Sequence, residues 1–441
     1  MYLNHKQTKY NILKSEKNII VWGLSLTTKE ILNIDKSIKN KIKYIVDKNE
    51  KLQNTTYKNI QIIDPKKLKS LNNYLIILWG GHTLSISKYL IKNSIKNFII
   101  DYTKSTNYIP HNLTIQVDKI DKNQNNHDKN FIFSKQISDY IYQQPFNLLV
   151  KPFKSQIYPA LSPKKIDKNL LLISYHTKGK SNKQILRWKE GYLQEMVTFD
   201  KKGYSGWSSL CTKNIDKLLK NIPSKKANQT FEFLSNKYIS TNLSKYIQPK
   251  NSKFTFPKKF IFFPLQTIHD SVMYHSYFNP TILIKKIVTI LNEKNIPLVI
   301  KQHPLCNDEK VSKLLKKYEN EKKIILYAGS IHDAILKATT IYTINSGVGF
   351  EALLHLKPVV TFGKSDYMSM TKNVNDLDII KKEPFYSIDE KQKDIIKKFL
   401  HYYIDKKSIF INDDNEKKLK KLINSFIINY LNQRENISDA S

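Results

Sequence analysis

TINSGVGFEALLHLKPVVTFG, residues 343–363, is the stretch that decides the fold of this chain. Two apolar runs flank a short polar segment that contains two glycines, and a proline precedes the second run. A strand that ends at Asn345 and Ser346, a tight turn through the glycines and a helix from about residue 348 account for this order. Strand, turn and helix in succession predict a parallel α/β unit, because parallel strands need a crossover connection.

The same alternation continues on both sides of this stretch. Strands are predicted at 258–266, 296–304, 322–329, 340–346 and 357–363, and helices near 279–294, 307–319, 331–338, 390–404 and 415–431. Nearer the N-terminus, apolar runs at 18–23, 41–47, 74–81 and 97–101 predict a smaller Rossmann-like unit, and a further buried strand is predicted at 169–177. The predicted fold class is therefore α/β, with three units.

Composition changes divide the chain further. We predict a Rossmann-like accessory domain at 1–105, a polar linker at 106–135, a second α/β domain at 136–255, a third at 256–432 and a disordered tail at 433–441. In the first domain Gly23 and Asp47 end two strands, as in dinucleotide-binding folds. The loop after Gly23 has one glycine where that fingerprint has three, which favours a structural domain over a cofactor site.

The charge balance limits the classes of partner. The 441 residues carry a formal net charge of +35, and Arg187 and Arg434 are the only arginines among 73 basic residues. Because base readout favours arginine, we expect no nucleic-acid partner. Such a charge would attract the chain to an anionic membrane surface. No apolar stretch approaches the roughly 18 residues of a spanning helix, so we expect a cytoplasmic protein, peripheral at the inner face of the membrane.

Polar residues follow the predicted strands of the third domain. Asn345, Ser346 and Gly347 precede the free N–H groups of a helix, where an anion can bind. Glu351 lies one turn into that helix, where its carboxylate can accept hydrogen bonds from sugar hydroxyls. An ordinary capped turn explains these residues equally well when the motif is taken alone.

Two further segments favour a binding site. Lys301 and His303 of KQHP end a strand of the same predicted sheet, and the imidazole could donate a hydrogen bond to a phosphate. Asp270 of PLQTIHDSV follows another strand, where a carboxylate near an activated sugar could act as a base, a nucleophile or a stabiliser of positive charge. Alternatively, Asp270 caps the next helix.

Residues 187–210, RWKEGYLQEMVTFDKKGYSGWSSL, are rich in aromatic and acidic side chains. One interpretation is a sugar-stacking wall with a proton carrier, Glu190 or Asp200; the other is a set of core aromatics. The candidate wall consists of Trp188, Tyr192, Tyr204 and Trp207. Neither acid can be chosen from sequence alone. The two cysteines, Cys211 and Cys306, are too few for a disulfide framework or a zinc site, and we expect no metal.

Taken in order, WKEGYL with GYSGW, PLQTIHDS, KQHP, and SIHDAILKA leading into TINSGVGFEALLHLKPVVTFG resemble the bacterial capsule polysaccharide biosynthesis proteins, a family that includes β-Kdo transferases. The likeness covers about residues 165–370. It implies a GT-B-like pair of Rossmann-like domains, preceded here by the extra small domain. It also implies a retaining glycosyltransferase that moves the acidic ketosugar Kdo from CMP-Kdo to a glycan or lipid-linked acceptor, without a cofactor.

The resemblance further implies roles for individual residues. Asp270 would form the glycosyl-enzyme, and His303, Ser346 and Glu351 would contact the cytidine monophosphate. Glu190 is our candidate acid/base. LKPV stands where the family commonly has GKPV, and residues 1–105 lie outside the likeness. Two alternatives stay open: a CDP-polyol phosphotransferase of the teichoic-acid type, and a non-catalytic basic adaptor that binds membrane or nucleic acid.

Overall fold

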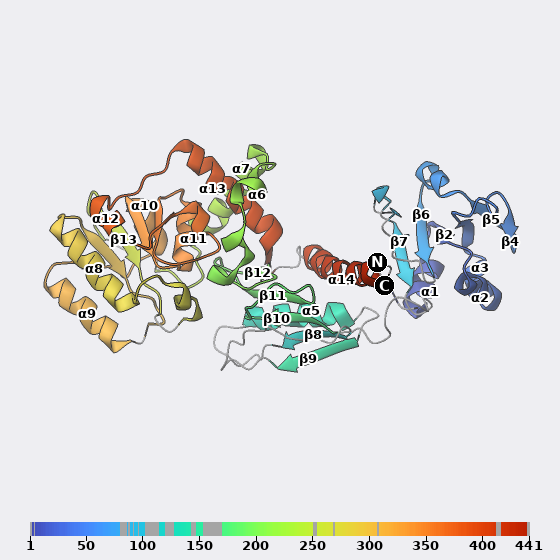
Figure 1. Cartoon of the computed structure of the whole chain (residues 1–441), viewed down its shortest axis with the longest axis horizontal. Helices are drawn as coiled ribbons and strands as arrows, with labels where there is room; N and C mark the ends of the chain where they lie inside the picture. Colours follow the sequence, from blue (N-terminus) through green and yellow to red (C-terminus); the bar gives the residue numbers. More distant parts are fainter. Residues whose placement is uncertain are drawn as a thin grey trace.

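The computed structural model contains three β-sheets along an elongated molecule. Figure 1 shows the N-terminal sheet at one end, the third sheet at the other and the middle sheet between them. The structure describes residues 2–3, 5–79, 86, 89–90, 92–95, 97–101, 114–119, 128–142, 147–152, 170–249, 254–267, 270–306, 308–411 and 416–438.

The first sheet has the strand order β1-β7-β6-β2-β3-β5-β4 and is parallel except at β4. Its strands are β1 (Tyr2–Leu3), β2 (Asn18–Trp22), β3 (Ile42–Val46), β4 (Thr56–Tyr57), β5 (Ile60–Ile63), β6 (Tyr74–Leu78) and β7 (Phe98–Asp101), with helices α1 (His5–Lys14), α2 (Leu26–Ile34) and α3 (Lys36–Lys39).

The carboxylate of Asp47 joins the turn that follows β2 to the turn that follows β3. One oxygen accepts a hydrogen bond from the Leu24 amide at 2.9 Å, and the other accepts from the Asn49 amide at 2.9 Å. Gly23 has φ +87°, a backbone conformation that glycine adopts readily. These contacts favour the structural interpretation of this turn.

The middle sheet has the order β19-β12-β11-β10-β8-β9. It comprises β8 (Thr114–Lys119), β9 (Asn147–Pro152), β10 (Leu170–Tyr175), β11 (Ile185–Glu190), β12 (Met196–Asp200) and β19 (Ser408–Phe410), with helices α5 (Asp128–Tyr142) and α14 (Glu416–Ser438). Strand β8 lies inside the predicted linker 106–135 and pairs with two strands. Strand β19 returns from the third unit to pair with β12, and α14 continues into the tail predicted at 433–441.

The third sheet is entirely parallel, in the order β15-β14-β13-β16-β17-β18. Its strands are β13 (Ile261–Pro264), β14 (Leu298–Lys301), β15 (Ile325–Leu326), β16 (Thr340–Thr343), β17 (Val359–Thr361) and β18 (Lys372–Asn373). Apolar residues of α8 (Pro280–Glu293), α9 (Glu309–Asn320) and α12 (Asp378–Lys382) pack on one face, and those of α10 (Ile331–Lys337), α11 (Gly347–Leu354) and α13 (Glu390–Tyr402) on the other.

Helices also join the middle and third units. The α6 (Ile215–Leu219) and α7 (Ser224–Leu234) helices lie between β12 and β13 in sequence but pack against α13. The core on that face of the third sheet also contains Leu193 and Met196 of the middle unit. The predicted fold class, two Rossmann-like units preceded by a small third one, is therefore confirmed.

The strand order places the functional candidates. Strands β14, β13 and β16 are neighbours, so their carboxyl ends lie side by side at one edge of the sheet. Residues 265–267, 270–272, 302–304 and 344–347 follow these strands and meet at that edge. Within the described ranges, no helix is long and apolar enough to cross a membrane.

Candidate functional site

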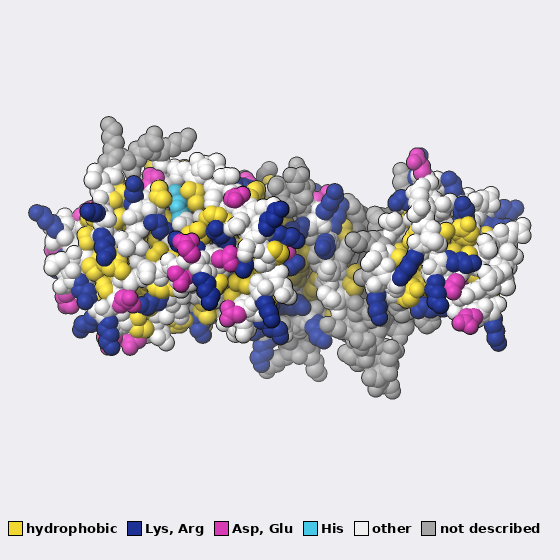
Figure 2. All heavy atoms as spheres, turned by 90° about the horizontal axis from the view of Figure 1, so that it is seen from above, with side chains coloured by type: hydrophobic (Ala, Val, Ile, Leu, Met, Phe, Trp, Pro, Cys, Tyr) yellow, Lys and Arg dark blue, Asp and Glu magenta, His cyan; other side chains and the backbone are white. Residues whose placement is uncertain are grey.

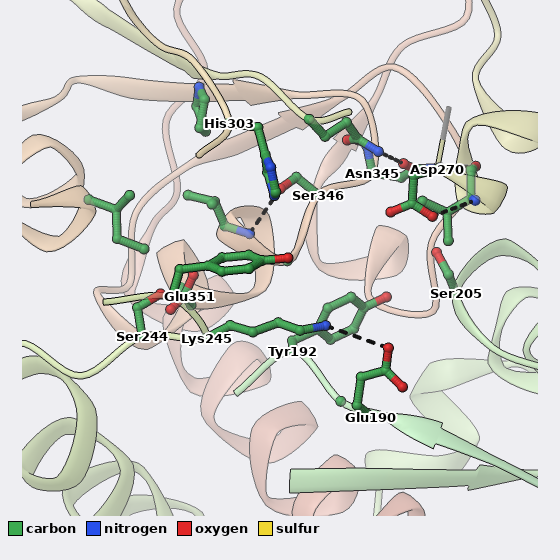
Figure 3. Close-up of a pocket in the computed structure, with 18 of the residues that line it drawn as sticks. Glu190, Tyr192, Ser205, Ser244, Lys245, Asp270, His303, Asn345, Ser346 and Glu351 are labelled. Atoms are coloured by element: carbon green, nitrogen blue, oxygen red, sulfur yellow. Dashed lines mark hydrogen bonds and ion pairs between the residues drawn. The ribbon is translucent and has the colours of Figure 1, made fainter. Parts of the chain in front are cut away.

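One pocket lies between the middle and third units. Its volume is about 1030 Å³, including the open mouth. Ten of the residues predicted for the site line it, namely Glu190, Tyr192, Tyr204, Asp270, Lys301, His303, Asn345, Ser346, Gly347 and Glu351. Figure 3 shows that side chains from both units surround a shared space. The predicted convergence of strand-end residues on one cavity is therefore present.

Asp270 caps a short turn and also lines the pocket. Its side chain caps the short 3₁₀ turn Ser271–His275 by accepting from the Val272 amide at 3.2 Å. The same carboxylate lines the pocket. It is also close enough to raise the pKa of His303 and of Lys189 by charge attraction, although burial lowers both pKa values more strongly.

His303 follows β14 and points into the cavity (Figure 3). Its Nδ1 accepts a hydrogen bond from the Leu305 amide at 3.1 Å. Burial lowers the pKa of His303, and the charge of Lys245 lowers it further, while Asp270 raises it. A neutral ring with Nδ1 as acceptor carries its hydrogen on Nε2, which makes Nε2 a donor for a ligand oxygen.

Lys301, at the end of β14, is already engaged by backbone. Its ammonium donates to the carbonyl of Gly329 at 2.5 Å and to that of Ala328 at 3.3 Å. Burial lowers the pKa of Lys301. The side chain lines the pocket, but it would have to break these contacts to reach a ligand directly.

The N-terminus of α11 faces the pocket through Ser346, Gly347 and Val348. Ser346 is the N-cap and accepts from the Val348 amide at 3.3 Å. Asn345 instead holds the loop after β13: its amide donates to the Val272 carbonyl at 2.8 Å, and its oxygen accepts from Gln266 at 2.8 Å. Asn345 therefore contributes to the site chiefly by fixing the position of the loop after β13.

Gly347 and Gly349, the glycines of this turn, leave room for neighbouring aromatic rings. Neither Gly347 nor Gly349 is among the glycines with positive φ. A Cβ on Gly349 would lie 2.4 Å from the hydroxyl of Tyr367, which donates to the Ser346 carbonyl at 2.5 Å. The prediction that they allow a tight turn is corrected for Gly349, which is needed because the Tyr367 ring crosses the helix closely.

Glu351 is buried below the helix N-terminus. Burial raises its pKa to about 8, against smaller lowering effects from the Ser244 hydroxyl and the charge of Lys245. Its Oε1 is buried and has no hydrogen-bond partner among the described residues. A buried carboxyl oxygen without a partner is costly, so a ligand hydroxyl that reached it would satisfy it.

Glu190 ends β11 on the opposite wall. It accepts from the Tyr175 hydroxyl at 2.6 Å, and Lys189 and Lys245 each lie 4.0 Å from its Oε1. Burial raises the pKa of Glu190, but these two lysines, His176 and the hydroxyl outweigh it and hold the pKa well below the usual range. In this arrangement Glu190 is ionised, so it can accept a proton but has none to give.

Two of the predicted aromatics line the pocket floor and wall. Tyr192 stacks on Phe350 at 5.1 Å and donates to Asp366 at 2.6 Å. Tyr403 donates to the other oxygen of Asp366 at 2.8 Å, and burial raises the pKa of that carboxyl to about 6. The hydroxyl of Tyr204 lies 3.0 Å from the Ser271 hydroxyl, which links the two units beside Asp270.

Three of the predicted sugar contacts do not reach the pocket. Trp188 is buried in the core against Phe133 and Tyr175. Asp200 is buried, accepts hydrogen bonds from the loop that follows it and pairs with Lys407. Trp207 lies outside the lining and stacks on Tyr274 with ring centroids 5.8 Å apart. Trp188 is therefore a core aromatic, the second of the two interpretations, and the burial of Asp200 removes it from sugar contact.

Several lining residues were not predicted from the sequence: Lys189, Ser205, Ser244, Lys245, Tyr246, Gln266 and Asp366. Lys189 stands inside the quoted WKEGYL motif and could have been found there. Ser244, Lys245 and Tyr246 belong to NLSKYIQPK, a polar run with no periodicity and no strand end to mark it. Only the tertiary structure brings that run to the pocket.

Comparisons with known proteins give one family and a set of distant structures. Residues 221–371 match the family described as capsule polysaccharide biosynthesis protein. A search of curated protein sequences found no match. Among solved structures, Thermosulfurimonas dismutans KpsC, beta Kdo 2,4 transferase, is 15% identical with a TM-score of 0.40, and covers 65% of this chain and 90% of its own.

Two more structures are similar at this level. Thermosulfurimonas dismutans KpsC, beta Kdo 2,7 transferase, is 17% identical with a TM-score of 0.39, over 70% of this chain and 99% of its own. Methanocaldococcus jannaschii UDP-GlcNAc 2-epimerase is 12% identical with a TM-score of 0.26, over 87% and 99% respectively. The matched residues 221–371 carry Asp270, His303, Ser346 and Glu351, and this segment of the chain is similar to the capsule polysaccharide biosynthesis protein family.

Proposed function

We propose that this protein is a glycosyltransferase of capsule or surface polysaccharide biosynthesis that uses a nucleotide-activated sugar. The observation that carries the proposal is the pocket in which Asp270, His303, Ser346 and Glu351 meet, all within the family segment. The donor that fits best is CMP-Kdo, transferred with retention to a glycan or glycolipid acceptor.

The donor half of the pocket suits a nucleoside monophosphate. The α11 N-terminus and the Nε2 hydrogen of His303 supply donors for one phosphate, and both stabilise the negative charge that develops as the sugar leaves. Glu351 supplies an acceptor for a ribose hydroxyl, and its unsatisfied Oε1 supports that assignment. Every one of these groups belongs to the third unit.

In the first step, a carboxylate oxygen of Asp270 attacks the anomeric carbon of the donor while the bond from that carbon to the phosphate oxygen breaks. The products are a glycosyl-enzyme ester and CMP. In the second step, an acceptor hydroxyl attacks the same carbon, the ester bond breaks and the Asp270 carboxylate is regenerated. Two inversions give net retention.

The acceptor hydroxyl must lose its proton in the second step. Glu190 lies on the wall that faces the third unit, and we assign it as the base that takes this proton. Its low pKa makes it a weak base in the empty pocket. It becomes a stronger base when a lysine beside it moves away.

The decisive experiment is incubation of the full chain and a lipid-linked glycan acceptor with a panel of cytidine-activated donors, followed by mass spectrometry of the acceptor. We expect a mass increase of one Kdo residue with CMP-Kdo. Addition of glycerol phosphate from CDP-glycerol would instead assign the chain to the teichoic-acid type of transferase. No addition from any donor would support the non-catalytic adaptor.

A further inference from the structure

A third wall of the pocket comes from residues 242–248, which connect the α7 region to β13. Three consecutive residues of this segment each contact a different candidate site residue. Ser244 donates to Glu351, Lys245 lies 4.0 Å from Glu190, and the ring of Tyr246 packs edge-on against His303 with centroids 5.0 Å apart. The segment therefore touches both halves of the site.

The start of α10 holds this segment from behind. The Ser330 hydroxyl donates to the side-chain oxygen of Asn242, and the Ile331 amide donates to the side-chain oxygen of Gln248 at 3.0 Å. His332 Nε2 lies 3.0 Å from the Leu243 carbonyl and must carry the hydrogen there. These hydrogen bonds hold both ends of the segment against α10. They therefore fix the position of residues 244–246 at the pocket.

His332 is itself held in place. Its Nδ1 lies 2.9 Å from Nε2 of His355. Since His332 Nε2 donates, Nδ1 accepts from His355, and both rings are neutral, in keeping with burial that lowers the pKa of each. The SIHDAILKA motif thus has a structural role, because its first three residues anchor the segment that carries Lys245.

Among the described residues, three lysines line the pocket, and they differ in how readily they can move. Lys301 donates to two backbone carbonyls, and Lys189 is 14% exposed with its ammonium 4.4 Å from the Tyr204 ring centroid. Lys245 is 39% exposed, and its acidic neighbour Glu190 lies at 4.0 Å, the outer limit of an ion pair. Lys245 is more exposed than Lys189, so its ammonium can turn toward a ligand more readily.

Resting on the proposed function, we propose that Lys245 binds the phosphate of the nucleotide donor and leaves Glu190 when it does so. In Figure 3 the Lys245 side chain runs from beside Ser244 and Glu351 to Glu190, and its charge also acts on Glu351 and His303. A phosphate at the α11 N-terminus would therefore compete with Glu190 for the ammonium. A phosphate carries more charge than a carboxylate and offers more acceptors. Donor binding thereby removes one of the two cations that weaken Glu190 as a base.

The test measures binding of CMP to the full chain by isothermal titration calorimetry. Lys245→Ala should raise the dissociation constant by about tenfold or more, because a charge-assisted contact to phosphate is lost. Lys245→Arg should stay within about threefold, since the charge is kept. Lys225→Ala removes an exposed lysine of α7 outside the pocket lining and should leave the affinity unchanged.

The outcomes separate this inference from the function on which it rests. If wild-type protein binds CMP and Lys245→Ala binds it equally well, the inference is overturned and the proposed function stands. A loss confined to CMP-Kdo would assign Lys245 to the sugar carboxylate and would also overturn it. If wild-type protein binds no CMP, both proposals are wrong. Lys245→Met, which retains the aliphatic stem, replaces the alanine variant if that variant fails to fold.

The anchoring role of His332 has its own readout. His332→Ala should weaken CMP binding several-fold, and His332→Gln should restore most of the affinity because its amide can donate to the Leu243 carbonyl. A folded His332→Ala variant with unchanged CMP affinity would show that α10 does not position Lys245.

Discussion

The carboxylate of Asp270 caps a 3₁₀ turn, a role that an amide can also fill, because asparagine and aspartate are comparable N-caps. An amide cannot serve as a nucleophile. We therefore predict that Asp270→Asn folds normally and binds CMP nearly as well as wild type, while sugar transfer falls by a factor on the order of 10³ or more. Calorimetry gives the affinity, and mass spectrometry of the acceptor gives the rate.

Asp308→Asn is the matched control for this change. Asp308 caps α9 by accepting from the Val311 amide at 2.9 Å and does not line the pocket. The same substitution there should leave both transfer and CMP affinity intact. Equal loss of binding and transfer in Asp270→Asn would refute the assignment of Asp270 as nucleophile.

Glu351 makes the empty protein sensitive to pH. Burial raises its pKa to about 8, whereas in the unfolded chain a glutamate ionises near pH 4.3. The folded state therefore holds the proton more tightly, and the stability that this contributes is present below about pH 4 and is lost as the pH rises through about 8. We predict that thermal stability falls more between about pH 5 and 8 in wild type than in Glu351→Gln.

Thermal unfolding followed by circular dichroism at both pH values measures this difference. Comparing the two variants removes the contribution of every other titrating group that they share. The glutamine keeps the size of the side chain and cannot ionise. If both proteins lose stability equally over this range, Glu351 ionises as an ordinary exposed glutamate would, and its burial does not matter for the pH dependence.

Some of these residues could be identified from sequence because their chemistry follows from strand position. Asp270, His303 and Ser346 each follow a strand, and parallel strands bring such positions together. Trp188 and Asp200 could not be placed in this way, because a polar or aromatic residue within a strand points to either face and only packing decides which. Trp188 packs on Phe133 in the core.

At the scale of an element, the N-terminus of α11 depends on one close packing contact. A Cβ on Gly349 would lie 2.4 Å from the Tyr367 hydroxyl and 3.0 Å from a Thr343 methyl carbon, so the ring must shift. We predict that Gly349→Ala lowers the free energy of unfolding by about 1–3 kcal/mol. CMP affinity should fall with it, because the displaced hydroxyl supports the Ser346 carbonyl.

Gly347→Ala is the comparison within the same turn. Its Cβ would lie 3.3 Å from a ring carbon of Tyr192, a contact that a small side-chain shift relieves. Urea denaturation and CMP calorimetry on both variants test the difference. If Gly347→Ala proves as damaging as Gly349→Ala, the cost comes from the backbone of the turn and not from the crossing Tyr367 ring.

Elements with a clear period were predicted closely, and elements without one were missed. Every strand of the third sheet except β18 was expected, since each is a short apolar run between helices. Strand β8 was assigned to a linker because polar residues follow it. The segment 242–248 has no period at all, and hydrogen bonds to the start of α10, 83 to 89 residues away, determine its position.

At the scale of the whole molecule, the chain crosses back between units near its C-terminus. Strand β19 pairs with β12, and apolar residues of α14 pack into the core that contains the middle sheet. The domain boundaries predicted from the sequence place β19 and α14 up to residue 432 in the third unit. Domains drawn as continuous stretches of sequence cannot include this pairing. Strands β12 and β19 pair residues that lie far apart in the sequence, such as Met196 and Phe410.

The net charge of the whole molecule predicts binding to anionic membranes. Lysines are spread over the face shown in Figure 2, with acidic side chains between them, so no single basic patch on that face explains the net charge of +35. Attraction of such a surface to a membrane is long-ranged and screened by salt. We predict that the protein sediments with vesicles of phosphatidylglycerol and phosphatidylcholine at about 50 mM salt, and that most of it is released at about 500 mM.

Vesicles of phosphatidylcholine alone are the control and should bind little. Binding that resists salt, or that is equal on neutral vesicles, would point to an inserted apolar contact and would contradict a purely electrostatic association with the membrane.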